Sequence, residues 1–278
     1  MILNFLTNKK NIALIAAVGL PIIFAIIFIM FSPVSCNITS DSENEYIADS
    51  SSSAESSTSK DGVLIVGSDI NYPPFVFVKN GNTVGFDVDL AGEIAKRMGK
   101  EIEIVPIPWD CNFKELNNDE IDMEISAIPI TEEYEKIVDF SSPYFLLEYL
   151  LVSLSGAEIK IKEDLEGKAV GILEIEKENL DNDCLLNYEI HTYGGVIEMF
   201  DDLKNKKIEG VLISLPQGVN KLKDKKELYI VLNRIKTNKE FGIVFKKGNI
   251  LREEVDEILE EIKEDGTYDE IYNEWFGL

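Results

Sequence analysis

The sequence predicts an α/β protein in which two blocks of strands and helices follow one another. Short apolar runs rich in β-branched residues, such as Val63–Val66, are typical of buried strands. Between these runs, apolar residues recur with the 3.6-residue period of an amphipathic helix. The alternation restarts near Ile161. Alternating strands and helices form mainly parallel sheets, and two such blocks indicate two lobes with a ligand cleft between them.

In the first block, the pattern favours a hairpin and then a helix between the strands. Residues 75–84 alternate around Asn80-Gly81, a dipeptide typical of tight hairpin turns. Asp87 is expected to cap a helix that Gly99 closes. The other expected elements are strands at 63–66, 101–107 and 121–125 and a short helix at 113–116.

The second block repeats the alternation and is followed by a helical carboxyl terminus. Its expected strands are 169–173, 189–193, 211–213 and 229–232, with helical stretches after Glu174 and at 196–203 and 219–222. A strand at 243–245, a long helix at 251–262 and an amphipathic segment at 268–276 come last.

Charge and composition exclude several classes of function. The chain has 278 residues, with 27 Lys and Arg against 51 Asp and Glu, a net charge of −24. Nucleic acids and anionic membrane surfaces are bound through basic patches, so neither is an expected partner of the folded part. One His and three Cys exclude a multi-His metal site, a four-Cys zinc site and a disulfide-dense scaffold. No cofactor is expected.

The amino terminus has the features of a membrane signal. Residues 12–31 carry no charge and would span about 30 Å as a helix, the thickness of the apolar core of a bilayer. Lys9 and Lys10 precede this segment, so the positive-inside rule places the remainder outside the cytoplasm. The Ser-rich stretch 37–61 has few apolar residues and is predicted to be a disordered linker.

Cys36 follows the apolar segment, in the sequence Ser32-Pro33-Val34-Ser35-Cys36. This stretch resembles a bacterial lipoprotein signal, in which the Cys is lipidated after cleavage. Ser35 fits that pattern, whereas Pro33 stands where an aliphatic residue is usual. Residues 1–36 are therefore predicted to be a lipoprotein signal or, alternatively, an uncleaved membrane anchor.

Five stretches, in order and in register, resemble one protein family. They are GSDINYPPF (67–75), VGFDVDL (84–90), ITEE (130–133), VDFSSPY (138–144) and DGTY (265–268), the last followed by WFG (275–277). These motifs are similar to those of the bacterial extracellular solute-binding proteins of family 3, which serve polar amino acid ABC transporters. The resemblance covers residues 62–278.

The resemblance implies a type II periplasmic-binding fold with two lobes. Lobe one would comprise 62–148 and 243–278, lobe two 149–242, and crossing strands near 148–154 and 241–246 would form the hinge. Such proteins close on a small polar solute and then dock on an ABC permease and its ATPase. The resemblance implies a monomer at the extracellular face of the cytoplasmic membrane or in the periplasm.

The resemblance also assigns four candidate solute contacts at positions that match the family. Asp69 and Tyr72 follow the first strand, Trp109 follows the strand at 101–107, and Ser126 follows the strand at 121–125. The two aromatic rings are suited to stacking on a solute or to binding a cation.

Other positions depart from the family pattern for an amino acid zwitterion. The arginine that normally binds the carboxylate is replaced by Tyr134, and a hydroxyl donor before it by Pro129. Small hydroxyl residues at a helix start are replaced by Glu176 and Lys177, and the aspartate that meets the ammonium by Ser214.

Three interpretations follow for the solute. It lacks a carboxylate and is a cation or polyol held by Tyr72, Trp109, Asp69 and Glu176. Alternatively, Lys177 substitutes for the arginine and the solute remains anionic or amino-acid-like. In the third interpretation, solute binding is weak or lost and the fold serves as a sensor or scaffold.

An enzyme is not expected. Some relatives of this fold are periplasmic dehydratases, but those bind dicarboxylates and would need the missing arginine. The sequence contains no visible nucleophile–base pair, metal cluster or phosphate loop.

The same candidate residues also have structural interpretations. Asp69 could close a turn, Tyr134 could fill space, and Glu176 and Lys177 could form an exposed helix start. The sequence leaves these interpretations open. Cys111 and Cys184 fall in different predicted lobes and are expected to be free thiols.

Overall fold

The computed structural model describes residues 62–109, 112–180, 185, 187–223, 225 and 228–278. The predicted signal or anchor with Cys36, the predicted linker, Cys111 and Cys184 lie outside the described residues. Among the residues that are described, no helix combines the length and the apolar character needed to cross a membrane.

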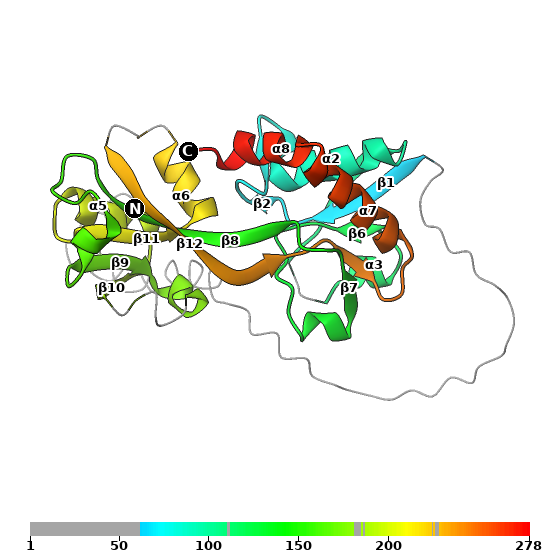
Figure 1. The fold of residues 1–278 in the computed structure, drawn as a ribbon. Coiled ribbons are helices and arrows are strands. Elements are labelled where there is room, and N and C mark those ends of the chain that lie inside the picture. Colours follow the sequence, from blue (N-terminus) through cyan, green and yellow to red (C-terminus); the bar gives the residue numbers. More distant parts are fainter. Residues whose placement is uncertain (1–61, 110–111, 181–184, 186, 224, 226–227) are drawn as a thin grey trace, which may run out of the picture. The chain divides into compact units, whose positions relative to one another are not determined.

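The first of two five-stranded sheets comes from the first block and the carboxyl-terminal part of the chain (Figure 1). Its strands are β1 (Val63–Ser68), β5 (Glu101–Pro106), β6 (Met123–Glu124), β7 (Val138–Phe140) and β13 (Val244–Lys246). They lie in the order β5-β1-β6-β13-β7. β1 runs parallel to β5 and β6, whereas β13 is antiparallel to β6 and β7. The alternating pattern therefore correctly predicted a parallel centre.

The second sheet comes from the second block. Its strands are β8 (Phe145–Leu154), β9 (Ala169–Leu173), β10 (Glu189–Tyr193), β11 (Gly210–Ser214) and β12 (Tyr229–Phe241), in the order β10-β9-β11-β8-β12. β9 is parallel to β10 and β11, and β8 is antiparallel to β11 and β12. Each sheet thus has three neighbouring parallel strands whose carboxyl ends lie at one edge.

The predicted hairpin is confirmed. It forms β3 (Val76–Lys79) and β4 (Asn82–Val84), and with β2 (Asn71–Tyr72) it makes a third, small sheet. Asn80 and Gly81 have φ angles of 54° and 82°, as a two-residue turn with positive φ at both positions requires.

Helices follow the predicted periodicity. They are α2 (Phe86–Arg97), α3 (Lys114–Asn117), α5 (Val196–Lys204), α6 (Leu215–Leu222), α7 (Leu251–Glu264) and α8 (Thr267–Phe276). The short 3₁₀ segments are η1 (Tyr134–Lys136), η2 (Lys162–Leu165) and η3 (Glu174–Asn179). The helical stretch expected after Glu174 begins with η3, and the positions 181–184 and 186 that follow lie outside the described residues.

Two long antiparallel strands, β8 and β12, pair from Phe145 opposite Phe241 to Leu154 opposite Tyr229 (Figure 1). The second crossing strand was predicted at 241–246, and that prediction was wrong. β12 ends at Phe241, and β13 begins at Val244 in the other sheet. The break falls at Gly242, where a Cβ would lie 2.8 Å from the Phe140 ring. The predicted residue ranges of the two lobes remain a prediction.

Asp87 does not cap α2, contrary to the prediction. The N-cap is Gly85, and the amides of Phe86 and Asp87 donate to the carbonyls of Pro74 and Phe75, each at 3.0 Å. Because backbone carbonyls satisfy these first helical amides, the Asp87 carboxylate is available for another contact. It is fully buried and accepts a 3.0 Å hydrogen bond from the amide of Ala127, in the loop after β6.

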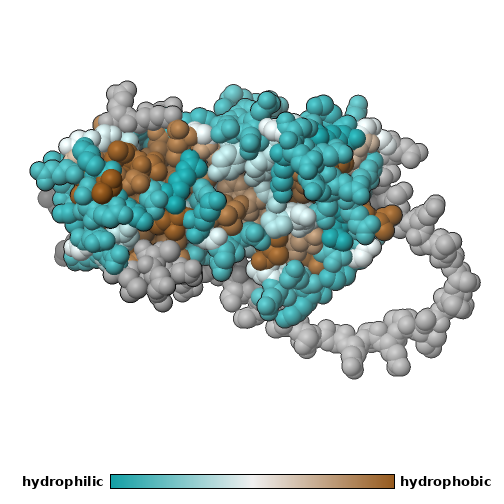
Figure 2. Space-filling view, viewed as in Figure 1, coloured by the Kyte–Doolittle hydropathy of each residue, from teal (hydrophilic) through white to brown (hydrophobic). Residues whose placement is uncertain are grey.

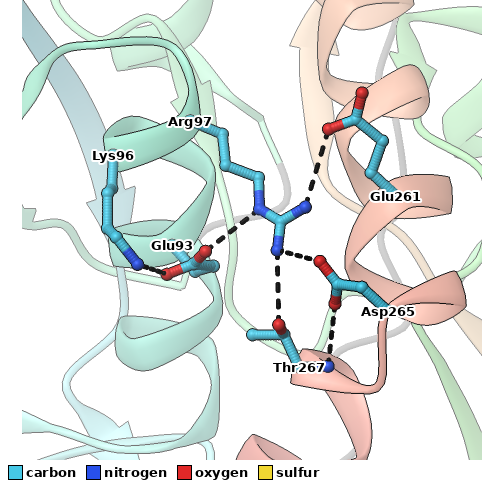
Figure 3. Close-up of polar contacts among 6 residues, drawn as sticks. All are labelled: Glu93, Lys96, Arg97, Glu261, Asp265 and Thr267. Carbon is cyan, nitrogen blue, oxygen red and sulfur yellow. Dashed lines mark hydrogen bonds and ion pairs between the residues drawn. The ribbon is translucent and has the colours of Figure 1, made fainter.

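Arg97 joins α2 to the turn between α7 and α8 (Figure 3). Its guanidinium donates to Glu93 at 3.0 Å, to Asp265 at 2.6 Å and to Thr267 at 3.3 Å, and it lies 3.5 Å from Glu261. Hydrogen bonds from Thr267 and from Arg97 lower the pKa of Asp265 to about 2. This network fixes the two carboxyl-terminal helices against the first block.

Replacing Arg97 with Ala should lower the melting temperature by several degrees. The change removes the hydrogen bonds that Arg97 donates to Glu93, Asp265 and Thr267. It also leaves Glu261 and Asp265 without the guanidinium as their cation. The adjacent Lys96→Ala is a matched control, since Lys96 is largely exposed and, among the described residues, pairs with Glu93 alone. Thermal melts at low and high salt measure both effects, and an equal shift for the two variants would contradict this role of Arg97.

Candidate functional site

In the first sheet, the predicted contacts lie just beyond the carboxyl ends of the neighbouring parallel strands. Asp69 and Tyr72 follow β1, Trp109 follows β5 and Ser126 follows β6. Because β5, β1 and β6 are adjacent and parallel, these loops share one edge of the sheet. Tyr72 and Trp109 are exposed by 38% and 39%, unlike most aromatic residues of the core.

Asp69 closes a local turn. Its carboxylate accepts hydrogen bonds from the amide and the side chain of Asn71, at 3.2 and 2.8 Å, and its own amide donates to the hydroxyl of Ser126 at 3.0 Å. The turn-closing interpretation therefore has direct support. The hydrogen bond from Asp69 to Ser126 joins the loop after β1 to the loop after β6.

Tyr72 rests on the aromatic core of the first block. Its ring stacks on Phe75 with centroids 5.4 Å apart, and Phe75 packs edge-on against Phe145 at 4.9 Å. One face of the Tyr72 ring is thus fixed by packing while part of the residue stays exposed.

In the second sheet, the structure brings Glu176 and Ser214 together. Glu176 follows β9, Ser214 ends β11, and the two strands are parallel neighbours. The Ser214 hydroxyl donates to the Glu176 carboxylate, the Ser214 amide donates to it at 3.4 Å, and the Gln217 side chain donates at 3.1 Å. Glu176 is only 6% exposed. Burial raises the pKa of its carboxyl, and the hydrogen bonds from Ser214 oppose that shift.

Electrostatic interactions link the two sets of residues. Burial raises the pKa of Tyr72 to about 12, with smaller electrostatic contributions from Glu176 and Asp87. Burial, followed by the charge of Glu176 and a contribution from Tyr72, also raises the pKa of Tyr149.

Three residues of this arrangement escaped the sequence analysis. Tyr149 pairs with Ser214 across β8 and β11, and its hydroxyl contacts the Glu176 carbonyl oxygen at 3.4 Å and the Asn179 side chain at 3.3 Å. Gln217 is the third residue of α6. Gln217 could have been found from the sequence, because it is a polar residue three positions after Ser214 at the start of the same helix. Tyr149 and Asn179 meet this group only through the tertiary structure.

Two predicted contacts are not part of this group. Tyr134 packs edge-on against Phe113 with ring centroids 5.4 Å apart, in the smaller hydrophobic cluster that also contains Ile107. Its space-filling interpretation is therefore supported. Lys177 lies on η3 beside Glu176 but is exposed.

The three arginines of the sequence are each engaged by acids of the protein. Arg97 forms the network described above, Arg234 lies 3.5 Å from Glu148, and Arg252 lies 3.3 Å from Asp256. None of the three follows the carboxyl end of β1, β5, β6, β9 or β11.

Two cavities have walls that include none of the predicted solute contacts. One, of about 520 Å³, includes Asp139 and Lys247 in its wall, and the other, of about 320 Å³, includes Leu222 and Leu278. Figure 2 shows apolar residues gathered over α6 and β12, beside the smaller cavity. Within the described residues, no three His, Cys, Asp or Glu side chains are placed to hold a metal ion.

Comparisons with known proteins agree with this architecture. The chain is 30% identical over 221 residues to the L-cystine-binding protein TcyJ of Escherichia coli (strain K12), covering 78% of this chain and 83% of TcyJ. It is 27% identical over 232 residues to the arginine-binding extracellular protein ArtP of Bacillus subtilis (strain 168), covering 82% and 90%.

A solved structure and a family profile complete the comparison. The second substrate binding domain of a putative amino acid ABC transporter from Streptococcus pneumoniae aligns with a TM-score of 0.69 and 25% identity, covering 77% of this chain and 99% of that domain. The two-lobed α/β type II periplasmic-binding fold is thereby confirmed. Residues 64–278 match the profile of one family, and the chain belongs to the bacterial extracellular solute-binding proteins, family 3.

Proposed function

We propose that this chain is the solute-binding component of an ABC importer of the amino acid type. It binds a small polar solute between its lobes and delivers it, as a monomer in the closed form, to a permease that works with an ATPase. It acts outside the cytoplasmic membrane, attached through the apolar segment 12–31 or through a lipid on Cys36. Closure requires a solute that binds the closed state better than the open one.

One observation carries the proposal. Polar residues follow the carboxyl ends of parallel strands in both sheets, and after burial the charge of Glu176 contributes to the raised pKa of Tyr72. A ligand at that position would contact loops of both sheets, which is what coupling between binding and closure requires.

We further propose that the solute contacts are altered relative to the family pattern. Tyr134 occupies the position of the carboxylate-binding arginine and packs on Phe113. Ser214 occupies the position of the acid that meets the ammonium, and it donates to Glu176. The acid at this edge of the second sheet is thus carried by the loop after β9 rather than by the end of β11. Asp69, Tyr72, Trp109, Ser126, Glu176 and Ser214 are the proposed contacts.

The proposal is tested by thermal melts of the full chain, purified in detergent, against amino acids, polyamines, quaternary amines, sugars and small organic acids. A solute at about 100 times its Kd adds roughly 2.7 kcal/mol to the free energy of unfolding and raises the melting temperature by several degrees. No shift with any solute class would favour the sensor or scaffold interpretation instead.

Replacing Trp109 with Ala should weaken binding of the solute found in this screen by about tenfold, since an exposed aromatic ring contributes roughly 1 kcal/mol or more to stacking or cation binding. The melting temperature of the free protein should hardly change, because Trp109 is 39% exposed. Ile250→Ala is the control, an apolar residue 84% exposed at the start of α7. Unchanged affinity in Trp109→Ala, measured by titration calorimetry, would remove Trp109 from the site.

A further inference from the structure

We infer that the solute is a small organic ammonium ion without a carboxylate group, and that Glu176 is its counter-ion. The inference rests on the proposed solute-binding function and names the chemical class of the solute. It follows from three features of the described residues, which concern the anion, the aromatic surface and the cations of the site.

The first feature is a carboxylate held in place by the protein. Three donors reach the Glu176 carboxylate, namely the hydroxyl and amide of Ser214 and the side chain of Gln217. Burial raises the pKa of this carboxyl, and the hydrogen bonds from Ser214 favour its ionised form against that shift. None of the three carries a positive charge, so the negative charge of Glu176 is hydrogen-bonded but not neutralised by them. A bound cation would supply the missing charge.

The second feature is a pair of exposed aromatic residues after the parallel strands of the first sheet. The Tyr72 ring is held by stacking on Phe75, and its pKa is raised by burial and then by the charge of Glu176. Trp109 follows β5, the neighbour of the strand that precedes Tyr72, and it is exposed. Aromatic faces beside a carboxylate favour an ammonium group, because the negative face of the ring and the carboxylate both attract a positive charge.

The third feature is the set of basic side chains near these loops. The three arginines are engaged by Glu93 and Asp265, by Glu148 and by Asp256. In the described parts of the loops that follow β1, β5, β6 and β9, Lys177 is the one basic residue, and it is exposed on η3 between Glu176 and Glu178.

A solute carboxylate at this site would therefore approach Glu176 without a buried cation to bind it. Like charges placed close together in a partly desolvated site repel strongly, and an unpaired buried carboxylate loses its hydration. We expect the carboxylate to weaken binding at least a hundredfold.

Matched pairs of solutes that differ only in the carboxylate test the inference. We choose agmatine with L-arginine, histamine with L-histidine and cystamine with L-cystine, since relatives of this chain are described as binding arginine, histidine or cystine. Titration calorimetry with the full chain measures each pair. At least one amine should bind, with its amino acid a hundredfold weaker or undetectable. An amino acid that binds as tightly as its amine, or binding by none of the six, would overturn the inference.

A pair of variants tests the counter-ion. Glu176→Gln keeps the shape and an acceptor for Ser214 but removes the charge, and it should weaken amine binding at least tenfold. Glu174→Gln is the matched control, because Glu174 lies on the same 3₁₀ segment but is exposed. Equal affinity in the two variants would overturn the role of Glu176, and the wild-type pairs decide the solute class even where Glu176→Gln is poorly folded.

The outcomes separate this inference from the proposed function. If an L-amino acid binds tightly and its amine does not, the importer function stands and the cation inference fails. If no solute of any class shifts the melting temperature in the broader screen, both fail.

Discussion

Replacing Asp87 with Asn should remove a large pH dependence from the stability of this protein. Asp87 is fully buried, and burial raises the pKa of its carboxyl to about 7, although hydrogen bonds with Tyr144 and Ala127 oppose the shift. One of its two carboxyl oxygens has no hydrogen-bond partner among the described residues. The protonated form is therefore the one that the folded protein prefers.

The sign of the effect follows from proton binding. The unfolded chain releases the Asp87 proton near pH 3.8, whereas the folded chain keeps it until about pH 7. Between these values the folded state binds more protons, so the free energy of unfolding falls as the pH rises. At about 1.4 kcal/mol per pH unit, the contribution is complete below pH 3.8 and has declined by about 4 kcal/mol at neutral pH.

Urea unfolding of the wild type and of Asp87→Asn from pH 4 to pH 8 measures this contribution as the difference between their free energies of unfolding. The wild-type stability should fall relative to Asp87→Asn across the range, because Asn is neutral throughout. Asp201→Asn, on an exposed position of α5, should run parallel to the wild type. A constant difference between the wild type and Asp87→Asn would show that Asp87 does not retain its proton in the folded state.

Replacing Gly85 with Ala should destabilise the protein by about 3–5 kcal/mol, which lowers its melting temperature by roughly 10 °C. Gly85 has a φ angle of 143°, and a Cβ there would lie 1.9 Å from the Phe75 carbonyl oxygen and 2.9 Å from that of Pro74. These carbonyls accept the first amides of α2. Ala would therefore strain the backbone and displace the helix start together with Phe75, on which Tyr72 stacks.

Gly92→Ala is the matched control for this prediction. Gly92 lies within α2, and nothing lies within 4 Å of a Cβ at that position. Ala should leave the stability unchanged or raise it by up to about 1 kcal/mol, because it is the better helix former. Urea midpoints of the two variants give the comparison. A similar loss in both would show that the close contact of Gly85 with the Phe75 carbonyl is not the cause of the destabilisation.

Much of the fold was predictable because its signals are local. The 3.6-residue period predicted α2, α5, α7 and α8, and Asn80-Gly81 predicted the turn between β3 and β4. One missed element depends on a distant partner. β7 has three residues and pairs with β13, more than one hundred positions away in the chain. The role of Asp87 was misassigned for the same reason, since its acceptor atom serves Ala127 and the Pro74 and Phe75 carbonyls replace it at the helix start.

The sequence by itself determined the alternation of strands and helices, the hairpin turn and the absence of a fourth arginine, because each depends only on residue type and near neighbours. Only the tertiary structure decided that Glu176 and Ser214, 38 positions apart, share hydrogen bonds, since that requires β9 and β11 to pair in parallel. It also decided that Tyr134 packs on Phe113 and that Tyr149 joins the polar group. Side-chain partners across a sheet are set by strand order and register, which local sequence does not encode.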